Sequence, residues 1–169
     1  MIAALPVILQ LLVVLAGVIA LAIWLHRRLP EQWRIWGFGA LTFILSQVAR
    51  LPLLSAATAL ISVVLTPAHP AFVLTLAGIQ LATSGLFEEG ARYIVMRWLA
   101  RRVRTWRSGV MFGAGHGGAE AILVFAIAAI NTVVLLTMGD SIIQQTQAAA
   151  PQQVEAVRAQ IEAIRNGSS

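Results

Sequence analysis

Four long apolar segments constrain the fold of this chain more than any other feature. A transmembrane helix needs about 20 apolar residues, rising ~1.5 Å each, to cross a hydrocarbon core of ~30 Å. Four segments have this length, at residues 2–25, 35–65, 71–96 and 108–138. Only 11% of the residues are charged and 59% are hydrophobic, whereas soluble domains are about a quarter charged. The sequence therefore predicts an all-α fold, a polytopic transmembrane helix bundle with about four long helices.

Two of these segments need a closer reading. The segment 35–65 is too long for one straight span, and Arg50 and Pro52 lie near its middle. A proline inside a helix removes one backbone hydrogen bond, so we expect a kink there or a split into two shorter helices. The segment 2–25 has no basic region before it and exceeds the length of a signal-peptide core. It predicts a retained membrane helix.

The composition changes after Gly139, where the chain becomes polar and rich in glutamine. We therefore divide it into a transmembrane bundle, 1–139, and a polar tail, 140–169, and expect Asp140 to end the fourth helix at the membrane interface. Pro151 is well placed to begin a short amphipathic helix. The apolar residues of this helix recur at helical spacing: Val154, Val157, Ile161 and Ile164. We expect it to lie on the outer membrane surface or to pack on a partner.

The charges predict an orientation. All twelve basic residues are arginines, and most fall in the first and third loops between the apolar segments, whereas the second loop, "TPAHPA", has none. This asymmetry follows the positive-inside rule and does not indicate nucleic-acid binding. We expect an integral protein of the bacterial inner membrane with cytoplasmic basic loops and an outside N-terminus. The loop arginines are Arg27, Arg28, Arg34, Arg97, Arg101, Arg102, Arg104 and Arg107, and five tryptophans accompany them: Trp24, Trp33, Trp36, Trp98 and Trp106.

Two polar residues lie at matching depths inside the third and fourth segments. Glu88 stands eight residues before Met96 and His116 eight residues after Ser108, which places both ~12 Å below the basic edge. A charge at this depth costs ~2.5–3.5 kcal/mol on insertion scales, so intramembrane charges usually mark a function. We expect Glu88 and His116 to share a site.

Their neighbours extend this site. Arg92 follows Glu88 at i+4 and Glu89 at i+3, so either carboxylate could form the ion pair. His116 and Glu120 are also i, i+4, a spacing that lets one helix offer two ligands to a metal ion such as Zn²⁺. Each feature has a structural alternative: an ion pair for the glutamates and an interhelical hydrogen bond for the histidine.

Two further groups are candidates for support and packing. Gln47 and Arg50 lie one turn apart and could serve Glu120 as hydrogen bonder and counter-ion, or satisfy a kinked backbone. Gly109, Gly113 and Gly117 form a small-xxx-small stripe, which predicts close helix packing. The chain has no cysteine, which excludes disulfides, thiolate metal ligands and a cysteine nucleophile.

The motifs "GLFEEGARY" (85–93) and "FGAGHGGAE" (112–120) resemble the YhfC family of proposed membrane peptidases. That family belongs to a wider clan with the CAAX-prenyl endopeptidases, the bacteriocin-processing enzymes and the PrsW-type proteases. The segment "SQVARLPLL" at 46–54 is similar as well, and the resemblance spans most of 35–138.

The resemblance implies a multi-helix membrane fold with a site that opens toward the cytoplasm. It assigns Glu88 as the water-activating residue, Glu89 and Arg92 as its support, and His116 and Glu120 to the second motif. It leaves open whether the chemistry uses zinc or glutamate and histidine alone. The clan's third motif, on a later membrane helix, has no counterpart after residue 139, so we expect a portion of a longer protein or a reduced, inactive member.

Three functions are therefore considered. The first is an intramembrane endopeptidase acting on a membrane protein or peptide, with Glu88 as general base and His116 as metal ligand or oxyanion stabiliser. The second is a non-catalytic membrane protein that binds or transports cations through the same acidic and histidine cluster. The third is a degenerate fragment whose cluster is only structural.

Overall fold

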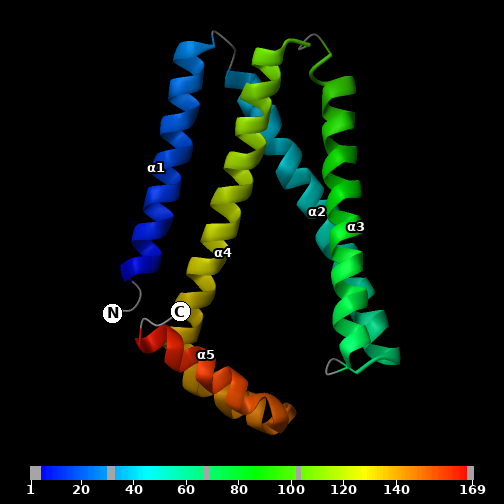
Figure 1. Cartoon of the computed structure of the whole chain (residues 1–169), viewed down its shortest axis with the longest axis vertical. Helices are drawn as coiled ribbons and strands as arrows, with labels where there is room; N and C mark the ends of the chain where they lie inside the picture. Colours follow the sequence, from blue (N-terminus) through cyan, green and yellow to red (C-terminus); the bar gives the residue numbers. More distant parts are fainter. Residues whose placement is uncertain (1–4, 30–32, 67–68, 102–103, 167–169) are drawn as a thin grey trace. The chain divides into compact units, whose positions relative to one another are not determined.

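The computed structural model describes residues 5–29, 33–66, 69–101 and 104–166, and every element in these ranges is a helix (Figure 1). Four are long and apolar enough to cross a membrane. The predicted all-α, polytopic fold is therefore confirmed. The elements are α1 (Leu5–Arg28), α2 (Trp33–Val64), α3 (Pro70–Trp98), α4 (Trp106–Ala149), the short 3₁₀ helix η2 (Pro151–Gln153) and α5 (Val154–Asn166). Residues 2–4 of the first apolar segment and Arg102 of the third loop lie outside the described residues.

The helix α2 is continuous through Pro52, so the expected alternative of a split into two pieces is not found. Proline removes a single helical hydrogen bond. A complete break would leave several more backbone groups without partners in a medium that has no water to replace them, which favours the continuous helix.

At the start of α3, Pro70 follows His69, whose Nδ1 accepts a hydrogen bond of 3.1 Å from the backbone N–H of Ala71.

The chain forms two compact units, and each is described by itself. The central unit, Leu21–Glu120, holds the end of α1, all of α2 and α3, and the first part of α4. The terminal unit consists of Met1–Ala20 and Ala121–Ser169. All the candidate site residues belong to the central unit.

The helices α2 and α4 approach each other closely through two glycines of the central unit. A Cβ atom on Gly39 would overlap the carbonyl oxygen of Phe112, and one on Gly115 would overlap that of Trp36. Beside this crossing lies an apolar core to which all four long helices contribute residues: Leu25, Ile35, Val95, Met111 and Phe112.

The predicted glycine stripe does not make this contact. A Cβ atom on Gly109, Gly113 or Gly117 would meet no described atom within 4 Å, and the three glycines are exposed. The prediction that they form the packing face is therefore wrong for the described residues. The contact uses another face of α4, because Phe112 and Gly115 are the residues whose backbone lies against α2.

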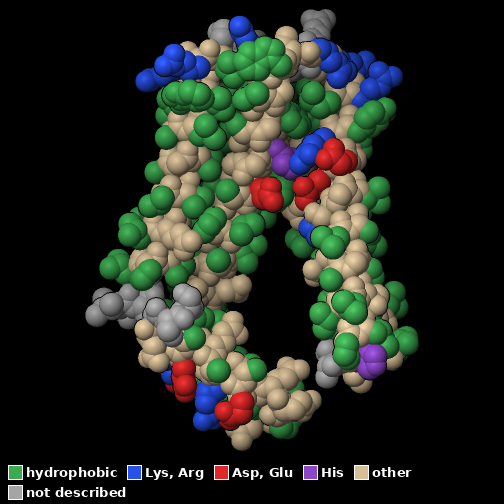
Figure 2. Space-filling view, viewed as in Figure 1, with side chains coloured by type: hydrophobic (Ala, Val, Ile, Leu, Met, Phe, Trp, Pro, Cys, Tyr) green, Lys and Arg blue, Asp and Glu red, His purple; other side chains and the backbone are tan. Residues whose placement is uncertain are grey.

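Most arginines of the central unit gather at one of its ends (Figure 2). This end contains the C-terminal ends of α1 and α3 and the N-terminal ends of α2 and α4. Trp24, Trp33, Trp98 and Trp106 are all exposed there, as expected for an aromatic belt at a membrane interface. Which side of the membrane this end faces stays a prediction.

The terminal unit corrects one expectation about the tail and shows what the short amphipathic helix contacts within it. The helix α4 does not end at Asp140 but continues to Ala149, and Asp140 forms an ion pair of 3.0 Å with Arg165 of α5. The apolar stripe of α5 also finds its partner within the chain, because Ile161 is buried and would lie 3.0 Å from a Cβ atom on Gly139. The amphipathic helix thus packs on the extended end of α4.

Candidate active site

Glu88 of α3 and His116 of α4 face each other in the central unit. The Glu88 Oε2 and His116 Nε2 atoms are 3.7 Å apart, and the two side chains are only 17% and 5% exposed. Figure 2 shows acidic, basic and histidine side chains together below the arginine-rich end of the central unit. The two side chains meet because Glu88 lies about as far from the C-terminal end of α3 as His116 lies from the N-terminal end of α4, as the spacing in the sequence predicts.

Arg92 contacts both glutamates and the histidine. Its Nη1 atom donates a hydrogen bond of 2.7 Å to Glu89 Oε1, whereas its Nη2 atom lies 3.8 Å from Glu88 Oε2. The shorter ion pair is therefore the one with Glu89, the i+3 alternative. The same Nη2 atom lies 3.1 Å from His116 Nε2.

The contact with Arg92 fixes the tautomer of His116. A guanidinium group can donate hydrogen bonds but cannot accept them, so His116 Nε2 must be the acceptor. The imidazole is then neutral and carries its proton on Nδ1. This Nδ1 atom is buried and has no hydrogen-bond partner among the described residues.

Ser84 holds the other oxygen of Glu88. Its hydroxyl donates a hydrogen bond of 2.8 Å to Glu88 Oε1, so one carboxylate oxygen is fixed and the other faces His116 and Arg92. Our sequence reasoning missed Ser84. The signal was present, because Gln80, Ser84, Glu88 and Arg92 follow one another at four-residue spacing and share one face of α3.

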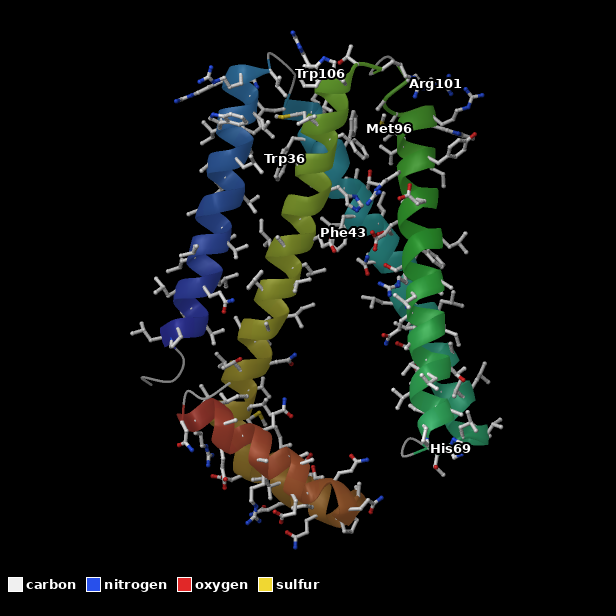
Figure 3. The ribbon with its side chains drawn as sticks, in the orientation of Figure 1. Trp36, Phe43, His69, Met96, Arg101 and Trp106 are labelled. Atoms are coloured by element: carbon white, nitrogen blue, oxygen red, sulfur yellow. The ribbon has the colours of Figure 1, made fainter. Side chains whose placement is uncertain are left out.

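Phe43 of α2, which is labelled in Figure 3, contacts the imidazole of His116. The ring centroids of Phe43 and His116 are 5.3 Å apart and the rings are nearly perpendicular, at 82°. This is the edge-to-face geometry that aromatic rings prefer. No pattern in the sequence indicates Phe43, because the contact depends on how α2 crosses α4.

Arg50 connects α2 to α3 rather than serving Glu120. Its guanidinium donates to the backbone carbonyl of Gln80 at 3.0 Å, to Thr83 Oγ1 at 3.3 Å and to Gln47 Oε1 at 3.3 Å. These three acceptors are neutral and come from the two helices that the arginine joins. Gln47 and Arg50 therefore support the α2–α3 pair next to the turn that carries Ser84.

The predicted metal ligands do not gather into a metal site. Glu120 is exposed, and no set of three His, Asp or Glu side chains among the described residues is arranged to hold a metal ion. In addition, the Nε2 atom of His116, the nitrogen turned toward Glu88, already accepts a hydrogen bond from Arg92. In this arrangement the residues do not fit a metal, and the roles assigned to Glu88, Glu89, His116 and Glu120 stay predictions.

An apolar cavity of about 430 Å³ is lined by residues of α2 and α3. Its lining is apolar except for Ser46 of α2. The α3 residues that line it come before and after the Glu88–Glu89 pair in the sequence. The α3 residues are Leu86, Phe87, Gly90, Ala91, Ile94 and Val95. One helix thus turns polar side chains toward His116 and apolar side chains toward this cavity.

Comparison with known proteins agrees with the family resemblance of the motifs at 85–93 and 112–120. A family model described as YhfC intramembrane metalloprotease matches residues 11–166. The chain is also similar to an uncharacterized membrane protein, YhfC, of Bacillus subtilis (strain 168), with 49% identity over 51 residues. That stretch is 30% of this chain and 20% of the relative, so the aligned part spans about a fifth of the relative's length. No solved structure matches the chain.

Proposed function

Because the chain belongs to the YhfC intramembrane metalloprotease family, we propose that it is an intramembrane endopeptidase, which hydrolyses peptide bonds in or near the lipid bilayer. The observation that carries this proposal is the approach of Glu88 Oε2 to His116 Nε2, at 3.7 Å, within membrane-spanning helices. Carboxylates and imidazoles are the groups that most often transfer protons in hydrolysis.

In the proposed reaction, Glu88 is the general base. Ser84 holds Oε1, which leaves Oε2 directed toward the space beside His116 and Arg92. A water molecule there would lose a proton to Oε2 while its oxygen attacks the carbonyl carbon of the substrate. The C–N bond would then break as Glu88 returns the proton to the leaving nitrogen.

Arg92 is suited to the charge that develops in this step. The attack converts the carbonyl oxygen into an oxyanion, which needs hydrogen-bond donors or positive charge close by. With its Nε2 atom accepting from Arg92, His116 cannot donate from this nitrogen, whereas the guanidinium of Arg92 can donate. We therefore assign the oxyanion to Arg92 Nη2. His116 would hold that guanidinium in place.

Replacing Glu88 tests the proposed reaction. In the complete protein, Glu88→Gln keeps the shape and the hydrogen bond with Ser84 but removes the base, so cleavage of co-expressed, tagged single-span membrane proteins should stop. Immunoblots of the tagged fragments give the measurement. Glu162→Gln, on the exposed face of α5, is the matched control and should cleave normally. Cleavage that persists in Glu88→Gln would rule out this assignment.

The site has more acidic than basic side chains, and this favours one alternative function, a non-catalytic protein that binds or transports cations. Glu88 and Glu89 share the single arginine Arg92, and Glu120 is exposed on α4. Purified protein in sealed vesicles distinguishes the two functions. Proton-dependent cation flux without any cleavage would favour transport over hydrolysis.

A further inference from the structure

We propose that α2 and α3 form a binding site for an anionic phospholipid, with an acyl chain in the apolar cavity between the two helices and the phosphate on Arg97 and Arg101. All the residues concerned belong to the central unit. The inference concerns lipid binding and does not require that the protein hydrolyse peptides.

The first support is the course of the apolar cavity, which leads from the surface of the central unit to its buried core. Its lining includes Leu86 and Ile94, which are 72% and 55% exposed, and also Ser46 and Val95, which are only 1% and 3% exposed. Val95 is a member of the apolar core. Because both helices are long and apolar enough to span a membrane, an acyl chain can enter this cavity sideways from the bilayer.

The second support is the lack of polar groups that could hold water in the cavity. Ser46 is the only polar side chain among the described residues that line it. Its hydroxyl already donates a hydrogen bond of 2.7 Å to the carbonyl of Phe43 and accepts one of 3.4 Å from Gln47. A buried water molecule needs two to four polar partners, so this space suits an apolar chain and not water.

The third support is a pair of arginines at the end of the same face of α3. Leu86, Gly90, Ile94 and Arg97 follow one another at spacings of three or four residues and therefore share that face. Arg101 lies close to Arg97, because its Nε atom donates a hydrogen bond of 3.1 Å to the Arg97 carbonyl. Both arginines are exposed, and within the described part of the chain neither forms an ion pair with a carboxylate.

This order of groups matches that of a phospholipid in a membrane. Arg97 follows Ile94 by three residues, so it lies ~4.5 Å further along the helix axis, just beyond the apolar cavity. The exposed Trp98 beside it is typical of the membrane interface, where lipid phosphates lie. Arginines at this level attract anionic headgroups, and the guanidinium fork matches the oxygens of a phosphate.

Native mass spectrometry of the complete protein in a non-ionic detergent tests the proposal, with phosphatidylglycerol and phosphatidylcholine offered in equal amounts. Each arginine near the membrane surface favours the anionic lipid, so the natural chain should retain one phosphatidylglycerol with a preference of roughly thirtyfold. Arg97→Gln together with Arg101→Gln should remove this preference. Arg27→Gln together with Arg28→Gln is the matched control, because these arginines are also exposed but belong to α1, and it should keep the preference.

A second pair of variants tests the cavity. Gly90→Leu places a side chain where the acyl chain would lie, and a Cβ atom on Gly90 meets no described atom within 4 Å, so the helices should still pack. Retention of phosphatidylglycerol should fall roughly tenfold, the equivalent of about two methylene groups that are no longer buried. Gly78→Leu also enters open space on α3 but lies outside the cavity lining, and it should retain the lipid normally.

Equal retention of the two lipids by the natural chain would overturn the proposal, as would equal effects of the two arginine pairs or of the two glycine variants. A dimer that Gly90→Leu dissociates would also overturn it, because the cavity would then be an interface between copies of the chain. Displacement of phosphatidylglycerol by inorganic phosphate, unaltered in Gly90→Leu, would show a site for the free anion instead.

Thermal unfolding shows whether each variant is folded, and the exposed arginines provide the test if Gly90→Leu is not. The lipid measurement is independent of the cleavage assay. Persistent cleavage in Glu88→Gln would remove the general base and leave the lipid site intact, whereas unselective lipid retention would remove the lipid site alone.

Discussion

Ser84, Glu88 and Arg92 lie one helical turn apart on α3, and each contributes a different property to the candidate site. Ser84 fixes one oxygen of Glu88 at 2.8 Å, and Arg92 reaches His116 at 3.1 Å. The meeting of Glu88 with His116 could be predicted, because helical rise is constant and both stand equally far from a short loop. The contact of Phe43 with His116 could not, because helical rise does not determine how α2 is rotated against α4.

The hydroxyl of Ser84 should affect the orientation of the Glu88 carboxylate and not the stability of the fold. Ser84→Ala removes a hydrogen bond to a charged group, and the carboxylate would lose its fixed orientation, so the cleavage rate should fall roughly tenfold. Ser84→Thr keeps the hydroxyl and should retain most of the rate. Ser62→Ala, on the exposed part of α2, is the matched control. Equal rates in Ser84→Ala and the natural chain would show that the hydrogen bond has no role.

At the scale of elements, the position of the site depends on the close crossing of α2 and α4. Both glycines of this crossing are visible in the sequence, but α4 carries glycines on more than one face, at Gly109, Gly113, Gly115 and Gly117. A stripe at four-residue spacing predicts that a helix can pack closely, not which face does so. The regular stripe therefore did not predict the contact, which Gly115, the residue before His116, makes with α2.

A pair of alanine substitutions distinguishes these faces. Gly115→Ala places a Cβ atom on the carbonyl oxygen of Trp36, which is backbone and cannot swing aside, so the unfolding free energy should fall by about 1–3 kcal/mol. Gly113→Ala adds the same atom in open space and should be neutral or slightly stabilising. Denaturation in mixed micelles measures both. Equal effects would contradict the packing described here.

At the scale of the whole molecule, hydropathy and charge predicted the class of protein, four spanning helices and their connectivity. Segment lengths alone could not show that α4 continues to Ala149, because the added turns are polar and their helical state depends on packing. The burial of Ile161 and the ion pair of Asp140 with Arg165 supply that packing within the terminal unit. The end at Ala149 follows from local sequence, because the residue before Pro151 is disfavoured in a helix and Ala150 has left the helical conformation.

The orientation in the membrane is predicted by the arginine loops and can be measured directly. Figure 3 shows His69 and Arg101 at opposite ends of α3. Since the chain has no cysteine, Thr66→Cys and Arg101→Cys each introduce a single thiol. A membrane-impermeant thiol reagent added to intact cells should label Thr66→Cys only, and permeabilised cells should show both. Labelling of Arg101→Cys in intact cells would reverse the predicted orientation.

The central claim is that Glu88 and His116 face one another, and thiol cross-linking tests it most directly. A chain with Glu88→Cys and His116→Cys is treated in the membrane with a short bifunctional thiol reagent, digested at the arginines between α3 and α4, and analysed by mass spectrometry. The two helix peptides should remain joined, whereas those of a control pair, Leu86→Cys with His116→Cys, should separate, because the Leu86 side chain is exposed. Separate peptides from the Glu88–His116 pair, or equal cross-linking of the control, would contradict the account.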